Sequence, residues 1–197
     1  MYHFVTASKD ATIYLQQPKQ NTGFDEILEV SKVYYGNLKD VSRSLIQFNT
    51  AELSSSIASG DVTMSSAELI IHECESLEIP TNYSIYAYAV SQSWDMGIGT
   101  RFDEISTEGV TWNKRNTNSS WLPGSASLDS SGSYNGKGGM WYTGSYATQS
   151  FNYESSDINM NVITPLTNWI SGSLPNNGFI LKHDSSFPKN SIKWLLK

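Results

Sequence analysis

The chain has 197 residues and a mass of 21.9 kDa, enough for one domain that buries roughly 70% of its unfolded surface. Its net charge is -6 with only 13 lysine and arginine residues, which disfavours binding to nucleic acid and to acidic membrane surfaces. Charged residues are only 16% of the chain and aromatic residues 12%, a composition typical of all-β folds with interfaces rich in hydroxyl and amide groups.

Two features of the sequence bear on compartment and redox chemistry. The N-terminal stretch MYHFVTASKD lacks the basic and apolar regions of a secretory signal, and no run of about 20 apolar residues could cross a bilayer. If Met1 is the natural start, we expect synthesis in the cytoplasm without a signal peptide and without membrane insertion. Cys74 is the only cysteine, and its apolar context predicts a buried, unreactive thiol.

The first quarter of the chain predicts short strands. Residues 11–15 (ATIYL) indicate a strand, and residues 20–23 (QNTG) a turn after it. Residues 27–30 begin a second strand, which a polar loop over residues 31–40 interrupts. Residues 43–48 (RSLIQF) then form a compact buried strand.

Two later segments alternate with a period of two residues. In Ser65–Glu73, alternate residues place Ala67, Leu69 and Ile71 on one face. In Ser84–Val90 the same alternation places small and apolar side chains opposite the two tyrosines of that segment. Because the two strands have equal phase, we expect them to form an antiparallel pair.

Residues 157–183 predict a corner made of a strand, a short helix and a second strand. The strand alternates through residues 158–163, and the helix begins at Thr164 with Pro165 in its first position. Leu166, Trp169 and Ile170 then share one helical face. We expect this capping helix over residues 165–170, ended by Gly172, before residues 179–182 return as a strand to the same core.

The interval 115–150 differs from the rest of the chain. It is rich in serine, glycine and asparagine and is punctuated by aromatic residues: Trp121, Tyr134, Trp141, Tyr142 and Tyr146. A segment this long in a compact domain is usually a functional or partner-binding loop. We expect these five residues to contact a ligand or partner by stacking on sugar faces or by anchoring a protein interface; packing over the edge of the fold is the alternative.

Several of these blocks together resemble the DNRLRE domain, a β-sandwich of jelly-roll type that also occurs among carbohydrate-binding modules. The opening matches as Ala-Thr-Ile-Tyr, Asn-x-Gly, Leu-x-Val and Arg-Ser-Leu-Ile-x-Phe, and the middle as Val-x-x-x-Trp and Gly-Val-Thr-Trp-Asn. The end matches as Val-Ile-Thr-Pro-Leu, Trp169 and Asn-Asn-Gly-Phe-Ile-Leu. The resemblance covers roughly residues 11–113 and 157–183 and implies a single all-β, antiparallel jelly-roll domain over residues 1–197.

Catalytic groups are scarce in the sequence. We interpret His3, His72 and His183 as surface or structural residues, and the neighbouring carboxylates at 25–26 and 103–104 as solvated. Adjacent strand residues point to opposite faces, so neither carboxylate pair can share a substrate. The glycine-rich run at 132–139 is one residue short of a phosphate-binding loop and is interpreted as a flexible turn. We expect no enzymatic activity.

No cofactor is expected, although the jelly-roll resemblance leaves open a structural calcium ion. Asp10, at the start of the first strand, and Asp157, before the last corner, are the candidate ligands.

Two functions fit these expectations. The first is a structural component of a tailed-phage virion, such as a capsid decoration, neck, fibre or tail accessory protein, whose partners are other virion proteins or copies of itself. The second is a carbohydrate-binding module of an exported, extracellular protein that binds polysaccharide. Fold resemblance alone does not decide between them.

Overall fold

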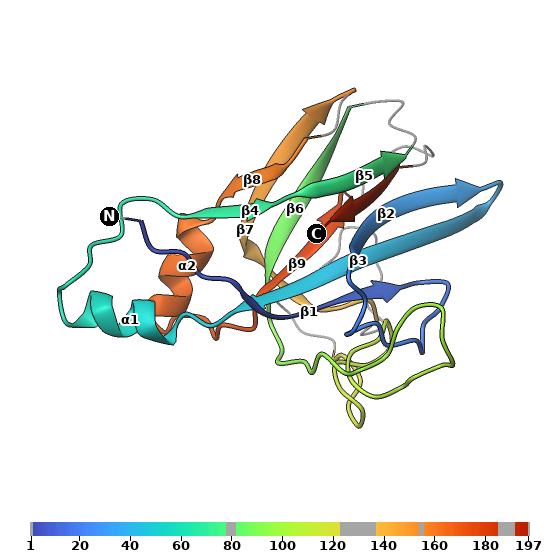
Figure 1. Ribbon diagram of the computed structural model, residues 1–197, viewed down its shortest axis with the longest axis horizontal. Helices are drawn as coiled ribbons and strands as arrows, with labels where there is room; N and C mark the ends of the chain where they lie inside the picture. The colour runs from blue at the N-terminus through green and yellow to red at the C-terminus, as the bar shows by residue number, and fades with distance from the viewer. Residues whose placement is uncertain (1, 78–81, 123–136, 154–155, 185–191, 197) are drawn as a thin grey trace.

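The computed structural model describes residues 2–77, 82–122, 137–153, 156–184 and 192–196 (Figure 1). This part of the chain is mostly β, with an antiparallel main sheet, a small two-stranded sheet and two short helices. The strands are β1 (Ala7–Tyr14), β2 (Leu28–Tyr35), β3 (Leu38–Phe48), β4 (Glu68–Ile71), β5 (Glu73–Leu77), β6 (Asn82–Val90), β7 (Trp141–Asn152), β8 (Ile158–Asn161), β9 (Phe179–His183) and β10 (Ile192–Leu196). The helices are α1 (Ala51–Ala58) and α2 (Ile163–Ile170). Neither has the length and apolarity that crossing a membrane requires.

The main sheet runs in the order β5-β10-β2-β3-β9-β6-β7, and β1 pairs with β3 outside this path. Strand β3 therefore has three partners. One edge pairs with β1, while the other pairs first with β2, up to Ser42, and then with β9, from Ser44. The small sheet consists of β4 and β8.

The first core cluster lies between the main sheet, the small sheet and α2. Figure 1 shows α2 and the β4–β8 pair together at one end of the molecule. The alternation predicted for 65–73, 84–90 and 158–163 is confirmed, because the residues predicted to face inward on β4, β6 and β8 are buried here. The main members are Leu69, Ile71, Ile85, Ala87, Ile158, Met160, Trp169, Phe179 and Leu181.

The second core cluster lies on the opposite face of the main sheet. Ile180 belongs to it, whereas its neighbours Phe179 and Leu181 belong to the first, because successive strand residues point to opposite faces. The segment after β6 contributes Trp94, Val110, Trp112 and Trp121 to this second cluster. The main sheet is therefore covered on both faces, by a small sheet and helix on one and by long loops on the other.

The predicted capping helix is confirmed, with slightly different bounds. Helix α2 begins at Ile163, two residues earlier than its proline suggested, and Val162 occupies the N-cap position. Pro165 lies in the first turn, where it interrupts no helical hydrogen bond. Gly172 follows the helix in the left-handed conformation that the residue after a C-cap favours.

Four expectations about local structure were wrong. Residues 31–40 are not a loop but the facing ends of a β2–β3 hairpin, in which Ser31 and Lys32 are buried by their partners. Strands β4 and β6 do not pair, because their buried faces contact the same core from different sheets. Helix α1 was not predicted, since three successive serines obscure its single buried residue, Leu53. Cys74 is exposed.

We predict that replacing Trp169 with alanine lowers the free energy of unfolding by about 3–5 kcal/mol. The indole is buried and lies 4.7 Å from the ring of Phe179, centroid to centroid, so truncation leaves a cavity between α2 and β9. Urea titration followed by circular dichroism measures the change, with the exposed Tyr2→Ala as control. A loss below about 1 kcal/mol would show that α2 does not close the core.

A second prediction concerns His183, whose ring is buried on β9. Burial lowers its pKa from 6.5 to about 3, and the nearby Lys32 and Lys182 charges act in the same direction. Between pH 6.5 and about 3, His183 therefore binds a proton in the unfolded chain but stays neutral in the folded chain. Stability should fall on acidification across this window, by on the order of 1 kcal/mol per pH unit from this group.

Urea titrations at several pH values test the prediction about His183. The variant His183→Leu should show a shallower pH dependence than the natural chain, while His3→Gln, at an exposed position, should keep the full slope. Parallel slopes for the natural chain and His183→Leu would contradict the assignment.

Candidate functional site

The structure separates the aromatic residues that the sequence grouped in the interval 115–150. Trp121 and Trp141 are 1% and 3% exposed and belong to the second core cluster, so their rings are not available to a ligand. Tyr142 is half-buried against the first cluster, and Tyr146 is 45% exposed. Tyr134 lies outside the described residues. The sequence left open whether these aromatic residues bind a partner or pack in the fold. The structure shows that the two tryptophans pack in the fold.

Tyr146 is part of a cluster of three neighbouring rings, here called the tyrosine face, which also contains Tyr86 and Tyr88. Tyr88 lies directly opposite Tyr146 in the β6–β7 register. The ring centroids of Tyr86 and Tyr88 are 5.5 Å apart with nearly parallel planes, and Tyr146 lies 5.8 Å and 5.2 Å from them. These rings project from the sheet side opposite Ile85 and Ala87, which face the first core cluster.

Buried cations and indole rings lie next to the tyrosine face. The Lys182 Nζ atom lies 5.7 Å from the Tyr88 ring centre and 5.0 Å from that of Trp141. The Arg43 guanidinium lies 5.2 Å from the Trp141 ring and 4.8 Å from the Trp112 ring. Cations held against aromatic faces away from water stabilise such an array by about 2 kcal/mol each, so Trp141 fixes the position of Tyr88.

The chemistry of the tyrosine face is that of neutral phenols. Burial, followed by the charge of Asp184, raises the pKa of Tyr86 above its ordinary value, so its hydroxyl keeps its proton. Tyr86 and Tyr88 are half-buried and Tyr146 is the most exposed. Exposed phenol rings with hydroxyl groups have the chemistry for stacking against a sugar ring or anchoring a protein interface.

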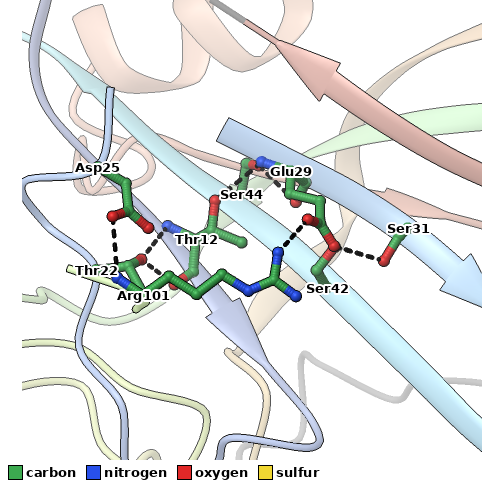
Figure 2. Close-up of polar contacts among 8 residues, drawn as sticks. All are labelled: Thr12, Thr22, Asp25, Glu29, Ser31, Ser42, Ser44 and Arg101. Atoms are coloured by element: carbon green, nitrogen blue, oxygen red, sulfur yellow. Dashed lines mark hydrogen bonds and ion pairs between the residues drawn. The ribbon is translucent and has the colours of Figure 1, made fainter. Parts of the chain in front are cut away.

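A second polar group, shown in Figure 2, joins two loops to the main sheet. The Glu29 carboxylate is buried and accepts from the Arg101 guanidinium, with an N–O distance of 2.6 Å. Its other oxygen accepts a hydrogen bond from the Ser31 hydroxyl, and Ser31 also bonds Ser42. The Arg101 side chain continues across the ring of Tyr14, whose pKa is raised by burial.

The remaining contacts in Figure 2 are made with the backbone. The Thr22 hydroxyl donates to the Thr12 carbonyl and accepts from the Thr12 N–H, and the Asp25 carboxylate accepts from the Arg101 N–H. The carboxylates and hydroxyls of this group are thus bonded to one another and to the main chain. We interpret it as a structural anchor rather than a reactive site.

The two candidate calcium ligands lie on different sheets. Asp10 is half-buried on β1, and this burial raises its pKa. Asp157 lies beside β8 and accepts from the Glu73 N–H and the His72 ring, contacts that lower its pKa. In the part of the chain that the structure describes, no three histidine, cysteine, aspartate or glutamate side chains gather as a metal site. The residues present therefore do not fit the six to eight oxygens that calcium takes.

No protein-family model matches the chain, and no curated protein matches it.

We predict opposite outcomes for two substitutions in this region. Trp141→Ala should lower the free energy of unfolding by about 3–5 kcal/mol, because it empties a buried position that two cations contact. Tyr146→Ala should lower it by less than about 1 kcal/mol, since nearly half of its surface is already in water. Urea titration of both variants gives the comparison. Equally small losses would mean that Trp141 is not part of the core.

Proposed function

We propose that this chain is a non-catalytic binding protein and that the tyrosine face is where its partner binds. The observation that carries the proposal is the clustering of three tyrosine rings on one side of β6 and β7, where Tyr86 stacks on Tyr88, Tyr146 lies tilted against both, and part of their surface is open to solvent. Aromatic rings held rigidly at a surface bind at low entropic cost, since their side chains are already ordered before the partner arrives.

This binding protein is, in our proposal, part of a virus particle. It acts as a virion component of a tailed phage, in contact with other virion proteins or with copies of itself. A composition low in charged residues and rich in hydroxyl and tyrosine side chains supports this idea because it suits repeated contacts in a symmetric assembly. A jelly-roll sandwich of the DNRLRE type belongs to the same proposal, supported by the sequence blocks and by the antiparallel strand pairing.

The alternative is a carbohydrate-binding module of an exported protein that binds polysaccharide. The same three tyrosines favour it, because the C–H faces of sugars pack against flat aromatic rings and sugar hydroxyls bond phenols. The two functions differ in what the tyrosine face contacts, which is a protein in the first case and a glycan in the second.

Affinity gel electrophoresis against neutral and acidic polysaccharides, with light scattering on the same sample, tests the proposal. The natural chain is compared with Tyr146→Ala and Tyr86→Ala, and Tyr2→Ala, at an exposed position of the N-terminal segment, is the matched control. We expect the two face variants to lose binding about tenfold or more, and the control to keep it.

The outcomes separate the two functions. Retardation of a monomer by one polysaccharide, abolished by Tyr146→Ala, would identify a glycan-binding module. A discrete oligomer that Tyr146→Ala dissociates, without retardation, would identify a particle component. If both face variants behave as the natural chain does in both measurements, the tyrosine face is not the binding surface.

A further inference from the structure

A second surface, distinct from the tyrosine face, exposes large apolar side chains on two adjacent loops. It is formed by residues 21–27, between β1 and β2, and residues 97–106, after β6, and is here called the loop platform. Figure 1 shows both loops beside β1. Its exposed side chains, between 59% and 88% accessible, are Phe24, Ile98, Phe102 and Ile105. Large exposed apolar side chains carried by neighbouring loops mark an interaction site more often than singly scattered ones do.

The two loops of the platform are joined through their backbones. The Phe24 N–H donates to the Gly99 carbonyl over 2.9 Å, and the Asn21 N–H donates to the Ser106 carbonyl over 2.8 Å. The Asn21 side chain is fully buried; its amide donates to the carbonyls of Met96 and Val110, and its oxygen accepts from the Gly99 N–H. The exposed side chains are therefore presented by a fixed backbone.

The structural anchor of Figure 2 attaches the platform to the sheet. Arg101 reaches from the second loop to the buried carboxylate of Glu29, and its guanidinium lies between the rings of Tyr14 and Phe102, at 4.2 Å and 5.2 Å. Asp25, on the first loop, accepts from the Arg101 N–H over 3.0 Å. Both loops thus share one anchor, which lowers the entropy that a partner would have to remove on binding.

The charge around the platform is negative. Residues 21–27 and 97–108 contain a single basic residue, Arg101, and its cation is paired with Glu29. The acidic residues on the same segments are Asp25, Glu26, Asp103, Glu104 and Glu108, and all but Asp25 are exposed. Apolar side chains surrounded by carboxylates repel an anionic membrane, and a second copy would meet them with the same charges.

We propose that the loop platform is a docking surface for a protein segment whose large apolar side chains are flanked by lysine or arginine. The apolar residues of such a segment cover Phe24, Phe102 and Ile105, while its cations face Glu26, Asp103 and Glu104. The complementary charges select this partner over neutral and acidic ones and speed its association at low salt. This interaction is independent of the tyrosine face.

The test uses the full chain, immobilised, and a displayed library of random short peptides as the probe. Peptides are selected on the natural chain after depletion on the double variant Phe102→Ser, Ile105→Ser. We expect the enriched peptides to combine large apolar residues with lysine or arginine. The best of them, made synthetically and labelled, is then titrated by fluorescence anisotropy.

Four variants locate the binding site of that peptide. Phe102→Ser with Ile105→Ser, and separately Glu104→Lys, should each weaken binding about tenfold or more. Ile70→Ser, which removes an exposed apolar side chain from β4, should leave binding unchanged. Tyr146→Ala should also leave it unchanged, even where it abolishes the interaction of the tyrosine face. Urea titration checks that each variant is folded. If the double variant is not folded, Glu104→Lys alone decides whether the peptide binds at the platform.

Three results would overturn the inference. The first would be a selection that enriches no peptide or enriches acidic ones. The second would be a selected peptide that binds the platform variants as well as it binds the natural chain. The third would come from phosphatidylcholine vesicles as a parallel probe. If they bind the natural chain but not the double variant, the platform is a lipid-binding surface instead.

Discussion

The pairing of β3 with different strands along its length is the constraint on which the rest of the structure depends. A strand edge can bond only one neighbour at a given residue, and this edge of β3 bonds β2 up to Ser42 and β9 from Ser44 onward. Strand β2 must therefore diverge from β3 at that point, where β9 begins to pair. Glu29 lies just beyond the last β2–β3 pair, so its backbone has no hydrogen-bonded pair on β3.

Side chains replace the backbone hydrogen bonds that this divergence removes. The Glu29 N–H donates to the Thr12 hydroxyl, and the Ser44 hydroxyl donates to the Glu29 carbonyl. Buried backbone groups cost a few kcal/mol when unpaired, so these small polar residues are needed in an otherwise apolar sheet. The Glu29 carboxylate is brought to the same place and binds Arg101, which in turn holds the loop platform. The topology of one strand thus determines where a surface loop is fixed.

The sequence was most informative where one face of a strand is buried. The alternation in β4, β6 and β8 identified inward residues correctly, because the period of two follows directly from strand geometry. It did not identify which strands pair, since Leu69 and Ile85 face the same core from different sheets. The polar network around Glu29 was missed for the same reason, as its members come from segments that only the topology brings together.

The tyrosine face illustrates how composition and geometry point to different residues. Tyr86 and Tyr88 were visible in the sequence as the outward side of β6, but nothing local indicated that Tyr146 lies opposite them. The sequence predicts that Trp141 is available to a ligand, because the segment around it is rich in glycine and serine. The structure gives these glycines another role, since a side chain at Gly138 would meet the Trp112 ring and the Arg43 guanidinium at less than 3 Å.

The close approach at Gly138 explains how a glycine-rich segment can stiffen a binding surface. Gly138 has a positive φ, which glycine adopts without strain, and its carbonyl accepts from Arg43. Arg43 is thereby held between Trp112 and Trp141, and Trp141 contacts Tyr88 at 5.8 Å. Without a Cβ atom, the backbone comes close enough to bury the cation, and the buried cation fixes the ring beneath the tyrosine face. Gly138 and Gly139 therefore serve packing, because a side chain at either would meet Trp112, Arg43 or Ile180 at less than 3 Å. Through Arg43 and Trp141 this packing reaches Tyr88.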